Sequence, residues 1–373
     1  MKILIVLNYY WPYISGLSEY ARALAEELAK EHNVTVLTGK HIEDLEDTEI
    51  VNGVTVIRAS IVSKISKGYI SPSFIYKFIG LQKEMDIVNL HLPMVEAGLF
   101  AWLTNRKKIV VTYHCDINLP HSLFNNLMVR IMDISSFFCL FRAKKIVVGS
   151  YDYAENSRIL PKFRSKWEQI HPFSSFYKKL KNKNKNTIDE SNIIIGFCGR
   201  IVEEKGIDVL IKAAPLVRER FPNLEVIIVG DYEGIAGGSI YRKLKKSLAW
   251  DESYIKFVGK LKEDELIEFY NSIDVFILPS INSLEAFGMV QVEAMLSGAP
   301  VVASNIAGVR EVVKNTGMGE LIEPGNVSSL AQGIIKVASN KRKYIKERHL
   351  VEKCYGIESA IDKYKILISK IIK

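Results

Sequence analysis

Two glutamates with seven residues between them form the most informative pattern in the chain. Glu285 and Glu293 lie in the stretch Pro279-Ser-Ile-Asn-Ser-Leu-Glu-Ala-Phe-Gly-Met-Val-Gln-Val-Glu-Ala-Met-Leu-Ser-Gly-Ala-Pro300. This stretch predicts a strand end, a loop, a helix and a glycine cap followed by proline. Glu285 would precede the helix and Glu293 would lie on one of its early turns, because a helix rises only about 1.5 Å per residue. One ligand could therefore contact both carboxylates.

The helix that begins after Phe287 would present backbone amides beside Glu285. The first N–H groups of a helix, here those of Gly288, Met289 and Val290, have no partner within it and carry a partial positive charge. Phosphate oxygens bind such amides, and carboxylates accept hydrogen bonds from sugar hydroxyls. The pattern fits a nucleotide sugar, with sugar hydroxyls on the first glutamate and ribose hydroxyls on the second. For either glutamate alone, an exposed residue without a ligand is the simpler interpretation.

Two cations occupy a second, glycine-bounded loop. The sequence Gly199-Arg200-Ile-Val-Glu-Glu-Lys205-Gly206 follows an apolar run and precedes an amphipathic one. Arg200 and Lys205 would each give a diphosphate a charge-assisted hydrogen bond worth roughly 1.5–3 kcal/mol. Ion pairs with Glu203 or Glu204 are the structural alternative.

Three residues of the first half have weaker signals. Gly16 ends a long loop at residues 8–16 where the backbone could approach a ligand. The loop lacks the compact G-x-G-x-x-G of dinucleotide-binding proteins, and a simple turn explains it equally well. His114 directly follows an apolar run, where a lone histidine is more often structural. Asp116 lies two residues beyond His114.

All these residues follow predicted strands in two similar halves. In the first half, strand-like apolar runs alternate with helical periodicity, the runs lying at 3–7, 34–37, 54–59, 86–91, 109–113 and 146–150. The second half repeats the pattern, with strands at 193–198, 224–229, 254–258 and 275–278 and helices at 207–220 and 263–270. Connections of this length predict parallel sheets covered by helices, whose ligands bind at the carboxyl ends of the strands.

The predicted fold class is α/β, with two Rossmann-like, doubly wound parallel-sheet domains. We expect a first domain at residues 1–172, a Lys/Asn-rich linker at 173–191, a second domain at 192–353, and a final helix at 354–373 that crosses back to the first. Pro215 predicts a kink or an early end in the helix at 207–220. For the apolar helix at 122–141, packing inside the domain is favoured over facing lipid.

The composition is that of a globular protein, with 48% hydrophobic and 25% charged residues, and it excludes a disordered chain. No spanning helix or signal peptide is expected. Four scattered cysteines without C-x-x-C spacing predict reduced thiols and a cytoplasmic location. The net charge of +8 owes much to lysines at 178–185, for which a solvated linker is favoured over peripheral contact with an anionic membrane. No nucleic-acid motif accompanies them, so nucleic acid is not expected as a partner.

Together these pieces resemble the GT-B-type retaining glycosyltransferases of family four, which carry a C-terminal domain called glycosyl transferases group one. The matching pieces are, in order, Gly16, His114, the loop at 199–206, and the two glutamates followed by Ala-Met-Leu-Ser-Gly-Ala-Pro-Val-Val-Ala-Ser. The resemblance covers nearly the whole chain. It implies two Rossmann-like domains that face each other across a cleft.

The resemblance also implies the transfer of a sugar from a nucleotide diphosphate donor, most readily a UDP- or GDP-sugar, to a hydroxyl of a glycan, glycolipid or lipid-linked acceptor. The donor would bind the second domain, with backbone around Gly259 and Met289 reading base and sugar. The acceptor would enter from the first domain, where Asp116 would orient its hydroxyl, and His114 would meet the donor sugar. The leaving phosphate would take the acceptor's proton. No cofactor is expected, because the nucleotide sugar is a substrate, and the absence of a D-x-D triplet predicts no metal.

The chain departs from the family in two places. Ser15-Gly16 replaces the usual Gly-Gly, and serine resists the positive φ that glycine accepts, so a tighter loop is expected. His171-Pro-Phe-Ser-Ser-Phe replaces the usual Pro-Asn-Gly-Val-Asp near the domain junction. Two alternative functions remain, a non-catalytic nucleotide-sugar-binding subunit and another enzyme of this architecture such as an epimerase or a phosphorylase. The intact cations and glutamates argue against both.

Overall fold

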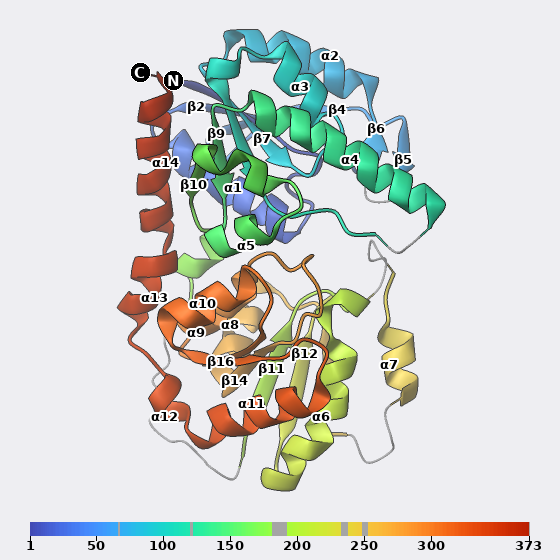
Figure 1. The fold of residues 1–373 in the computed structure, drawn as a ribbon, viewed down its shortest axis with the longest axis vertical. Coiled ribbons are helices and arrows are strands. Elements are labelled where there is room, and N and C mark those ends of the chain that lie inside the picture. Colours follow the sequence, from blue (N-terminus) through green and yellow to red (C-terminus); the bar gives the residue numbers. More distant parts are fainter. Residues whose placement is uncertain (66–67, 120–121, 181–191, 233–237, 248–252, 373) are drawn as a thin grey trace. The chain divides into compact units, whose positions relative to one another are not determined.

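The chain divides into two compact units in the computed structural model, which describes residues 1–65, 68–119, 122–180, 192–232, 238–247 and 253–372 (Figure 1). Unit 1 comprises Met1–Ser175 and Ile357–Lys373, and unit 2 comprises Phe176–Gly356. The boundary after Ser175 falls within the segment predicted as a linker. Residues 181–191 of that segment, with most of its lysines, lie outside the described residues.

Unit 1 contains an eight-stranded sheet in the order β10-β9-β8-β7-β1-β2-β4-β3 and a separate two-stranded sheet, β5-β6. Its strands are β1 (Lys2–Val6), β2 (Asn33–Gly39), β3 (Thr48–Val51), β4 (Val54–Ala59), β5 (Ser63–Ile65), β6 (Gly68–Ile70), β7 (Ile87–Leu92), β8 (Ile109–Tyr113), β9 (Lys145–Val148) and β10 (Trp167–Gln169). Its α-helices are α1 (Gly16–Ala29), α2 (Pro72–Leu81), α3 (Ala97–Leu103), α4 (Leu123–Arg142), α5 (Tyr151–Asn156) and α14 (Ile357–Ile372). Short 3-10 turns complete the unit at η1 (Gln82–Glu84), η2 (Arg106–Lys108) and η3 (Leu160–Lys166).

The central strands of unit 1 are buried on both faces, which explains their continuous apolar runs. Every residue of β7 and β8 is buried, as are four of the five residues of β1. Strands β2 and β4 follow β1 in the chain and lie beyond one edge of β1. The chain then returns to the opposite edge of β1, where β7 pairs with it. The winding therefore reverses between β1 and β7, and the loops after these strands leave the same edge.

A parallel sheet was predicted for unit 1, but its large sheet is not wholly parallel. Strand β3 pairs antiparallel with β4. The turn between them consists of Asn52 (φ 49°) and Gly53 (φ 81°). Positive φ at both central residues is typical of a tight hairpin turn, and Asn-Gly is its strongest sequence signal. The hairpin could thus have been recognised from the sequence.

Unit 2 contains a six-stranded, wholly parallel sheet in the order β13-β12-β11-β14-β15-β16. Its strands are β11 (Ile194–Cys198), β12 (Glu225–Val229), β13 (Ile255–Gly259), β14 (Val275–Leu278), β15 (Val301–Ser304) and β16 (Gly319–Ile322). Its α-helices are α6 (Ile207–Arg220), α7 (Tyr241–Ser247), α8 (Glu263–Ser272), α9 (Met289–Leu296), α10 (Val309–Thr316), α11 (Val327–Ser339), α12 (Lys341–Tyr344) and α13 (Arg348–Tyr355). The 3-10 turn η5 (Glu203–Lys205) precedes α6, and η4 (Ser175–Lys178) lies at the unit boundary.

Helix α6 has the predicted bounds, but the expectation of an early end at Pro215 was wrong. The helix continues through Pro215 to Arg220. Both Ala213 and Ala214, which precede the proline, are fully buried, together with Val217 after it. Packing of this face against the core of unit 2 outweighs the loss of one backbone hydrogen bond.

The chain's last helix, α14, belongs to unit 1 (Figure 1, red). Its Tyr364 hydroxyl lies 2.6 Å from the hydroxyl of Tyr20 on α1, and both side chains are buried. Lys365 forms an ion pair with Glu31, 2.6 Å between nitrogen and oxygen. The buried side of α14, which includes Ile361, Tyr364 and Ile368, thus packs against the rest of unit 1.

Helix α4 does not pack inside unit 1, contrary to the favoured expectation. Of its twenty residues only Ser136, Cys139 and Leu140 are buried. Large apolar side chains point to solvent instead, among them Leu123, which is 91% exposed. Among the described helices, α4 alone has the length and hydropathy of a membrane span, a weak indication by itself.

A substitution at Gly230 tests the close packing at the carboxyl edge of the unit 2 sheet. A Cβ on Gly230 would lie 1.8 Å from the carbonyl oxygen of Gly199. We expect Gly230→Ala to destabilise the protein by roughly 1–3 kcal/mol, the usual range for overpacking, measured by urea unfolding. Gly80→Ala is the control, because nothing lies within 4 Å of its Cβ and alanine favours its helix. Equal stability of the two variants would contradict the packing described here.

Candidate functional site

The predicted donor residues of unit 2 gather where the winding of its sheet reverses. The chain builds β12 and β13 on one side of β11, then returns to place β14 on the other side. The loops that follow β11 and β14 therefore begin side by side at the carboxyl edge of the sheet. Open α/β sheets bind their ligands at such switch points.

Gly206 lets these two loops touch. Its φ is +66°, and a Cβ there would lie 2.1 Å from the carbonyl oxygen of Pro279. The amide of Ile281 donates to the carbonyl oxygen of Glu204 at 3.0 Å, which joins the loops beside this contact. Any other residue at position 206 would force the loops apart. The glycine thus fixes the distance between the cation loop and the glutamate loop.

The contact brings Lys205 and Glu285 together as an ion pair, with Nζ donating to Oε2. Both side chains are largely buried, with 18% and 12% of their surface exposed. Ser280 also donates to Oε2 of Glu285, at 3.3 Å. The fold thus joins two side chains that lie eighty positions apart in the sequence. An anion that binds Lys205 would have to displace the carboxylate of Glu285 from the ammonium group.

Arg200 lies in the same loop but is less constrained. Its guanidinium pairs with Glu204 at 3.3 Å, and 45% of the side chain is exposed. The structural alternative of an ion pair with Glu204 is therefore realised here. A pair so exposed contributes little free energy, so breaking it for a better anion costs little. The loop itself is anchored, because the Gly199 amide donates to the carbonyl oxygen of Val229 at 3.0 Å.

Helix α9 begins directly behind the glutamate loop. Gly288 caps it with φ +76°, and a Cβ on Gly288 would lie 2.5 Å from the Cδ2 atom of Leu278. Gln291, which is buried, donates to the carbonyl oxygen of Phe287 at 2.5 Å and so fixes the loop before the helix. The backbone amides of Gly288, Met289 and Val290 thus lie at a helix N-terminus that approaches the sheet closely.

Glu293 lies one turn into α9 and is 8% exposed. Its Oε2 accepts a hydrogen bond of 2.6 Å from the hydroxyl of Tyr270, a residue that the sequence did not single out. Burial raises the pKa of Tyr270 well above its usual range, so the phenol stays a donor. Burial, with the nearby Glu293, also raises the pKa of Cys198 to about 12, so this thiol is not a nucleophile. Binding of ribose by Glu293 stays a prediction.

Gly259 lies farther from this centre, at the end of β13, two strands from β11. Its carbonyl oxygen accepts from the amide of Gly230 at 2.9 Å, and its φ is +75°. The side chain of Tyr232 lies 3.6 Å from the position of a Cβ on Gly259. An aromatic ring therefore lies beside the backbone at this edge. The role of Gly259 in reading the base stays a prediction.

In unit 1, the partly buried His114 lies against a fully buried histidine, His91, that the sequence analysis missed. His114 follows β8, its amide donates to the carbonyl oxygen of Leu92, and its Nε2 lies 3.0 Å from Nδ1 of His91 on β7. The ring of Tyr20 meets His114 edge-on at 5.5 Å. Residues 91 and 114 come together only because β7 and β8 pair in register, which places His91 beside Thr112.

The histidine pair favours one arrangement of protons. Burial lowers the pKa of His91 well below its usual range and that of His114 to about 3, so both rings are neutral near pH 7. In the described structure Nε2 of His91 is buried without a hydrogen-bond partner. An orphaned N–H donor there would be more costly than an orphaned lone pair. His91 therefore donates from Nδ1, and His114 carries its own proton on Nδ1.

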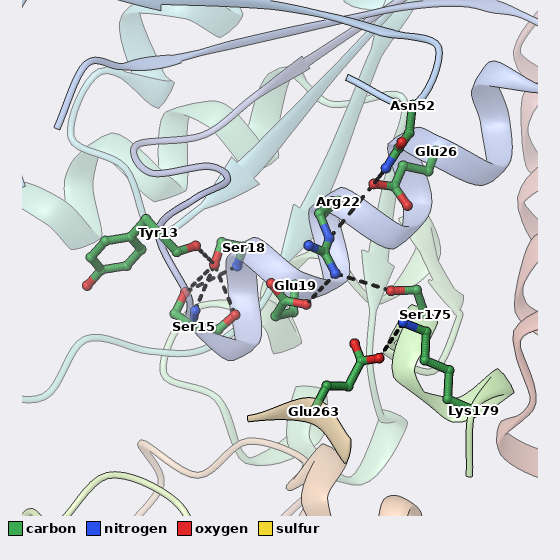
Figure 2. Close-up of polar contacts among 10 residues, drawn as sticks. All are labelled: Tyr13, Ser15, Ser18, Glu19, Arg22, Glu26, Asn52, Ser175, Lys179 and Glu263. Carbon is green, nitrogen blue, oxygen red and sulfur yellow. Dashed lines mark hydrogen bonds and ion pairs between the residues drawn. The ribbon is translucent and has the colours of Figure 1, made fainter. Parts of the chain in front are cut away.

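The loop before α1 differs from its expected form. Ser15 has an extended backbone with φ −154° and caps α1, its side chain accepting from the Ser18 amide at 3.2 Å (Figure 2). The hydroxyl of Ser18 donates in turn to the carbonyl oxygen of Tyr13 at 2.7 Å. No positive φ is required at Ser15, so the steric reason given for a tighter loop does not apply here. Gly16 is the first residue of the helix and is exposed, where its backbone remains accessible.

Asp116 is buried and hydrogen-bonded within unit 1, and its carboxylate does not face an open site. It is 4% exposed, and its Oδ1 accepts from the hydroxyls of Tyr113 at 2.6 Å and Ser157 at 2.8 Å. Its Oδ2 accepts from the backbone amide of Arg158 at 3.0 Å. Because these donors already use the carboxylate, a role in orienting an acceptor hydroxyl is not supported.

Comparison with known proteins identifies the family of the chain. The family model described as Glycosyltransferase Family 4 matches residues 14–172, and that described as Glycosyl transferases group 1 matches residues 178–354. An uncharacterized glycosyltransferase of Methanocaldococcus jannaschii is 26% identical over 91% of this chain and 90% of its own length. Several other curated relatives match over less than half of their own length.

Solved structures share the fold across both units. A sucrose-phosphate synthase from Thermosynechococcus elongatus has a TM-score of 0.77 at 18% identity, covering 99% of this chain and 98% of its own. The Anabaena protein HepE, solved in complex with UDP-glucose, has a TM-score of 0.72 at 20% identity, covering 99% and 100%. Two doubly wound parallel-sheet units of this kind define the GT-B class of glycosyltransferases. The chain belongs to glycosyltransferase family 4, with a group 1 C-terminal domain.

The neutral histidine pair makes a prediction about stability and pH. The unfolded chain binds protons at His91 and His114 below about pH 6.5, whereas the folded chain does not. The free energy of unfolding should therefore fall as the pH falls from about 6.5 towards 4, by at most about 1.4 kcal/mol per pH unit for each histidine. We expect His91→Gln to flatten this dependence, as measured by urea unfolding at a series of pH values.

An exposed histidine provides the matched control. His349 pairs with Glu347 at the surface, with 65% of its side chain exposed. The variant His349→Gln should keep the pH dependence of the unmodified protein. A His91→Gln slope identical to that of this control would contradict the neutral, buried pair.

Proposed function

We propose that the chain is a retaining, metal-independent hexosyltransferase that uses a nucleoside diphosphate sugar, a UDP- or GDP-sugar above all. The acceptor is a hydroxyl of a glycan, a glycolipid or a lipid-linked saccharide. The observation that carries this proposal is the buried Lys205–Glu285 pair at the switch point of unit 2, in a member of a glycosyltransferase family. A nucleotide sugar carries both groups that such a pair can bind, an anion and hydroxyls.

Donor binding exchanges partners within this pair. The diphosphate takes Lys205, recruits Arg200 from its exposed ion pair, and accepts from the amides at the start of α9. Glu285, released from the lysine, accepts from hydroxyls of the sugar, and Glu293 accepts from the ribose. Each charge-assisted hydrogen bond contributes about 1.5–3 kcal/mol before the cost of breaking the internal pairs. The exchange couples recognition of the phosphate to recognition of the sugar.

The proposed reaction breaks the bond between the anomeric carbon and the diphosphate oxygen and forms the new glycosidic bond on the same face. The leaving phosphate oxygen takes the acceptor's proton, so no protein base is needed. Lys205 and Arg200 stabilise the negative charge that develops on the leaving group. A neutral His114 with its proton on Nδ1 can donate a hydrogen bond to the donor sugar without repelling an oxocarbenium-like transition state.

Two further features of the proposal rest on sequence and on a relative. Metal independence rests on the absence of a D-x-D triplet and on the two cations that can neutralise a diphosphate. The HepE structure contains UDP-glucose, which makes a UDP-sugar the first donor to test. We also propose a cytoplasmic location, which agrees with the absence of disulfides among the four cysteines, all of them described.

A thermal-shift screen tests the proposed function. UDP-, GDP- and ADP-sugars are added in EDTA and then with magnesium, because a ligand that binds the folded state raises the melting temperature. We expect one nucleotide class to stabilise the protein in EDTA and magnesium to add nothing. NMR of the product should show the anomeric configuration of the donor. No stabilisation by any donor, or an inverted product, would contradict the proposal.

Substitutions in the ion pair test the roles of its members. Lys205→Ala should weaken donor binding by tenfold or more and lower turnover, because the diphosphate loses a charge-assisted partner. Glu285→Gln should abolish most transfer while leaving the melting temperature of the free protein within a few degrees. Activity is measured as sugar release from the donor in the presence and absence of acceptor.

Lys212→Ala is the matched control for the lysine substitution. Lys212 lies on α6 of the same unit, pairs with Asp208 and is 65% exposed. We expect normal donor binding and turnover in this variant. Activity retained by both Lys205→Ala and Glu285→Gln would overturn the assignment of the site.

A further inference from the structure

Helix α4 has its apolar side turned outward. Its exposed apolar side chains form one stripe along the helix, comprising Leu123, Phe124, Leu127, Ile131, Ile134, Phe137, Phe138 and Phe141. Helices such as α6 and α11 bury their apolar residues instead. Large apolar side chains that face water in this number mark a surface that binds something.

Helix α3 extends this surface. The two helices approach closely, because the amide of Gly98 donates to the Ser135 hydroxyl at 2.9 Å and a Cβ on Gly98 would lie 2.9 Å from the carbonyl oxygen of Ser135. Leu99, Trp102 and Leu103 of α3 are exposed. Trp102 meets Phe138 of α4 edge-on at 6.4 Å. We call the combined surface the α3–α4 face.

Cations border the α3–α4 face. Arg142 lies over the ring of Trp102, 4.9 Å from its centroid, Lys162 lies 5.6 Å from that of Phe137, and Lys166 lies 5.8 Å from that of Phe141. Arg130 lies exposed within the stripe itself. The acidic residue of α4, Asp133, is paired with Arg158 at 3.0 Å.

A further cation, Arg106, lies near enough to Lys166 for their charges to interact. Burial, and to a lesser degree the charge of Arg106, lower the pKa of Lys166. The Lys166 amine donates to the carbonyl oxygens of Leu140 and Phe141 at the end of α4, at 3.0 and 2.7 Å. An added negative charge beside this end of the helix would relieve the repulsion.

We infer that the α3–α4 face docks on the surface of an anionic phospholipid bilayer. Its apolar side chains enter the boundary between head groups and acyl chains, Trp102 lies at the level of the head groups, and the bordering cations meet lipid phosphates. Charge decides the occupant, because a second copy of this face would bring the same cations together. A transbilayer orientation is excluded by the burial of Cys139 and Leu140 in unit 1 and by the Asp133–Arg158 pair. This inference does not depend on the proposed transfer reaction.

Co-sedimentation of the full chain with vesicles tests the inference. We expect binding to vesicles of phosphatidylcholine with 30% phosphatidylglycerol, and at least tenfold weaker binding to phosphatidylcholine alone. Phe124→Ser with Leu127→Ser should weaken binding at least tenfold, and so should Arg130→Glu with Lys162→Glu. Trp102 should show a blue shift of fluorescence on binding that is lost in Trp102→Phe, while that variant still binds.

Matched controls come from other surfaces of unit 1. Tyr76→Ser with Ile366→Ser removes two exposed apolar side chains from α2 and α14, and Lys83→Glu with Lys363→Glu reverses two exposed lysines. Both control pairs should bind vesicles as the unmodified protein does. The inference is overturned if the unmodified protein does not bind anionic vesicles. It is equally overturned if the variants of the α3–α4 face bind these vesicles as well as the control variants do. A third result would also overturn it: the unmodified protein does not bind vesicles, sedimentation velocity shows that it is a dimer, and the variants of the α3–α4 face are monomers.

Discussion

The ion pair between Lys205 and Glu285 depends on the shape of the unit 2 sheet. The strands β11 and β14 are neighbours although the chain visits two other strands between them, so their loops leave the same edge. Gly206 removes the side chain that would separate these loops, and the pair forms where they touch. The start of α9 is set close behind by Gly288 for the same steric reason. Cation, carboxylate and helix amides are thus fixed before any ligand arrives.

The two units use the same kind of sheet edge with different electrostatics. At the switch point of unit 2, the charged side chains form ion pairs with each other, as Lys205 does with Glu285. A charged ligand can replace one partner of such a pair. At the edge of unit 1, burial keeps His91 and His114 neutral. The neighbouring carboxylate, Asp116, is enclosed by hydroxyl and amide donors. The histidines at the edge of unit 1 are therefore neutral, whereas the edge of unit 2 carries paired charges.

Much of this arrangement could be predicted from the sequence because its signals are local. The buried strands are uninterrupted apolar runs, and the glycine-bounded loop and the glutamates are each contained in one short stretch. Other features arise from packing between distant residues. The contact between His91 and His114 exists only because β7 and β8 pair. The enclosure of Asp116 likewise requires Ser157 and Arg158, which are distant in sequence. Helix α4 is apolar on most of its surface, so periodicity could not tell which side faces the core. The Asn52-Gly53 turn was local and was overlooked.

The central claim is that Lys205 recognises the diphosphate and not the rest of the donor. Calorimetric titration can test it in EDTA with the nucleoside diphosphate that stabilises the protein most and with the corresponding nucleoside, using the unmodified protein and Lys205→Ala. The account predicts a loss of affinity of tenfold or more for the diphosphate, equivalent to about 1.4 kcal/mol, and less than twofold for the nucleoside. Equal losses for the two ligands, or none for the diphosphate, would contradict it.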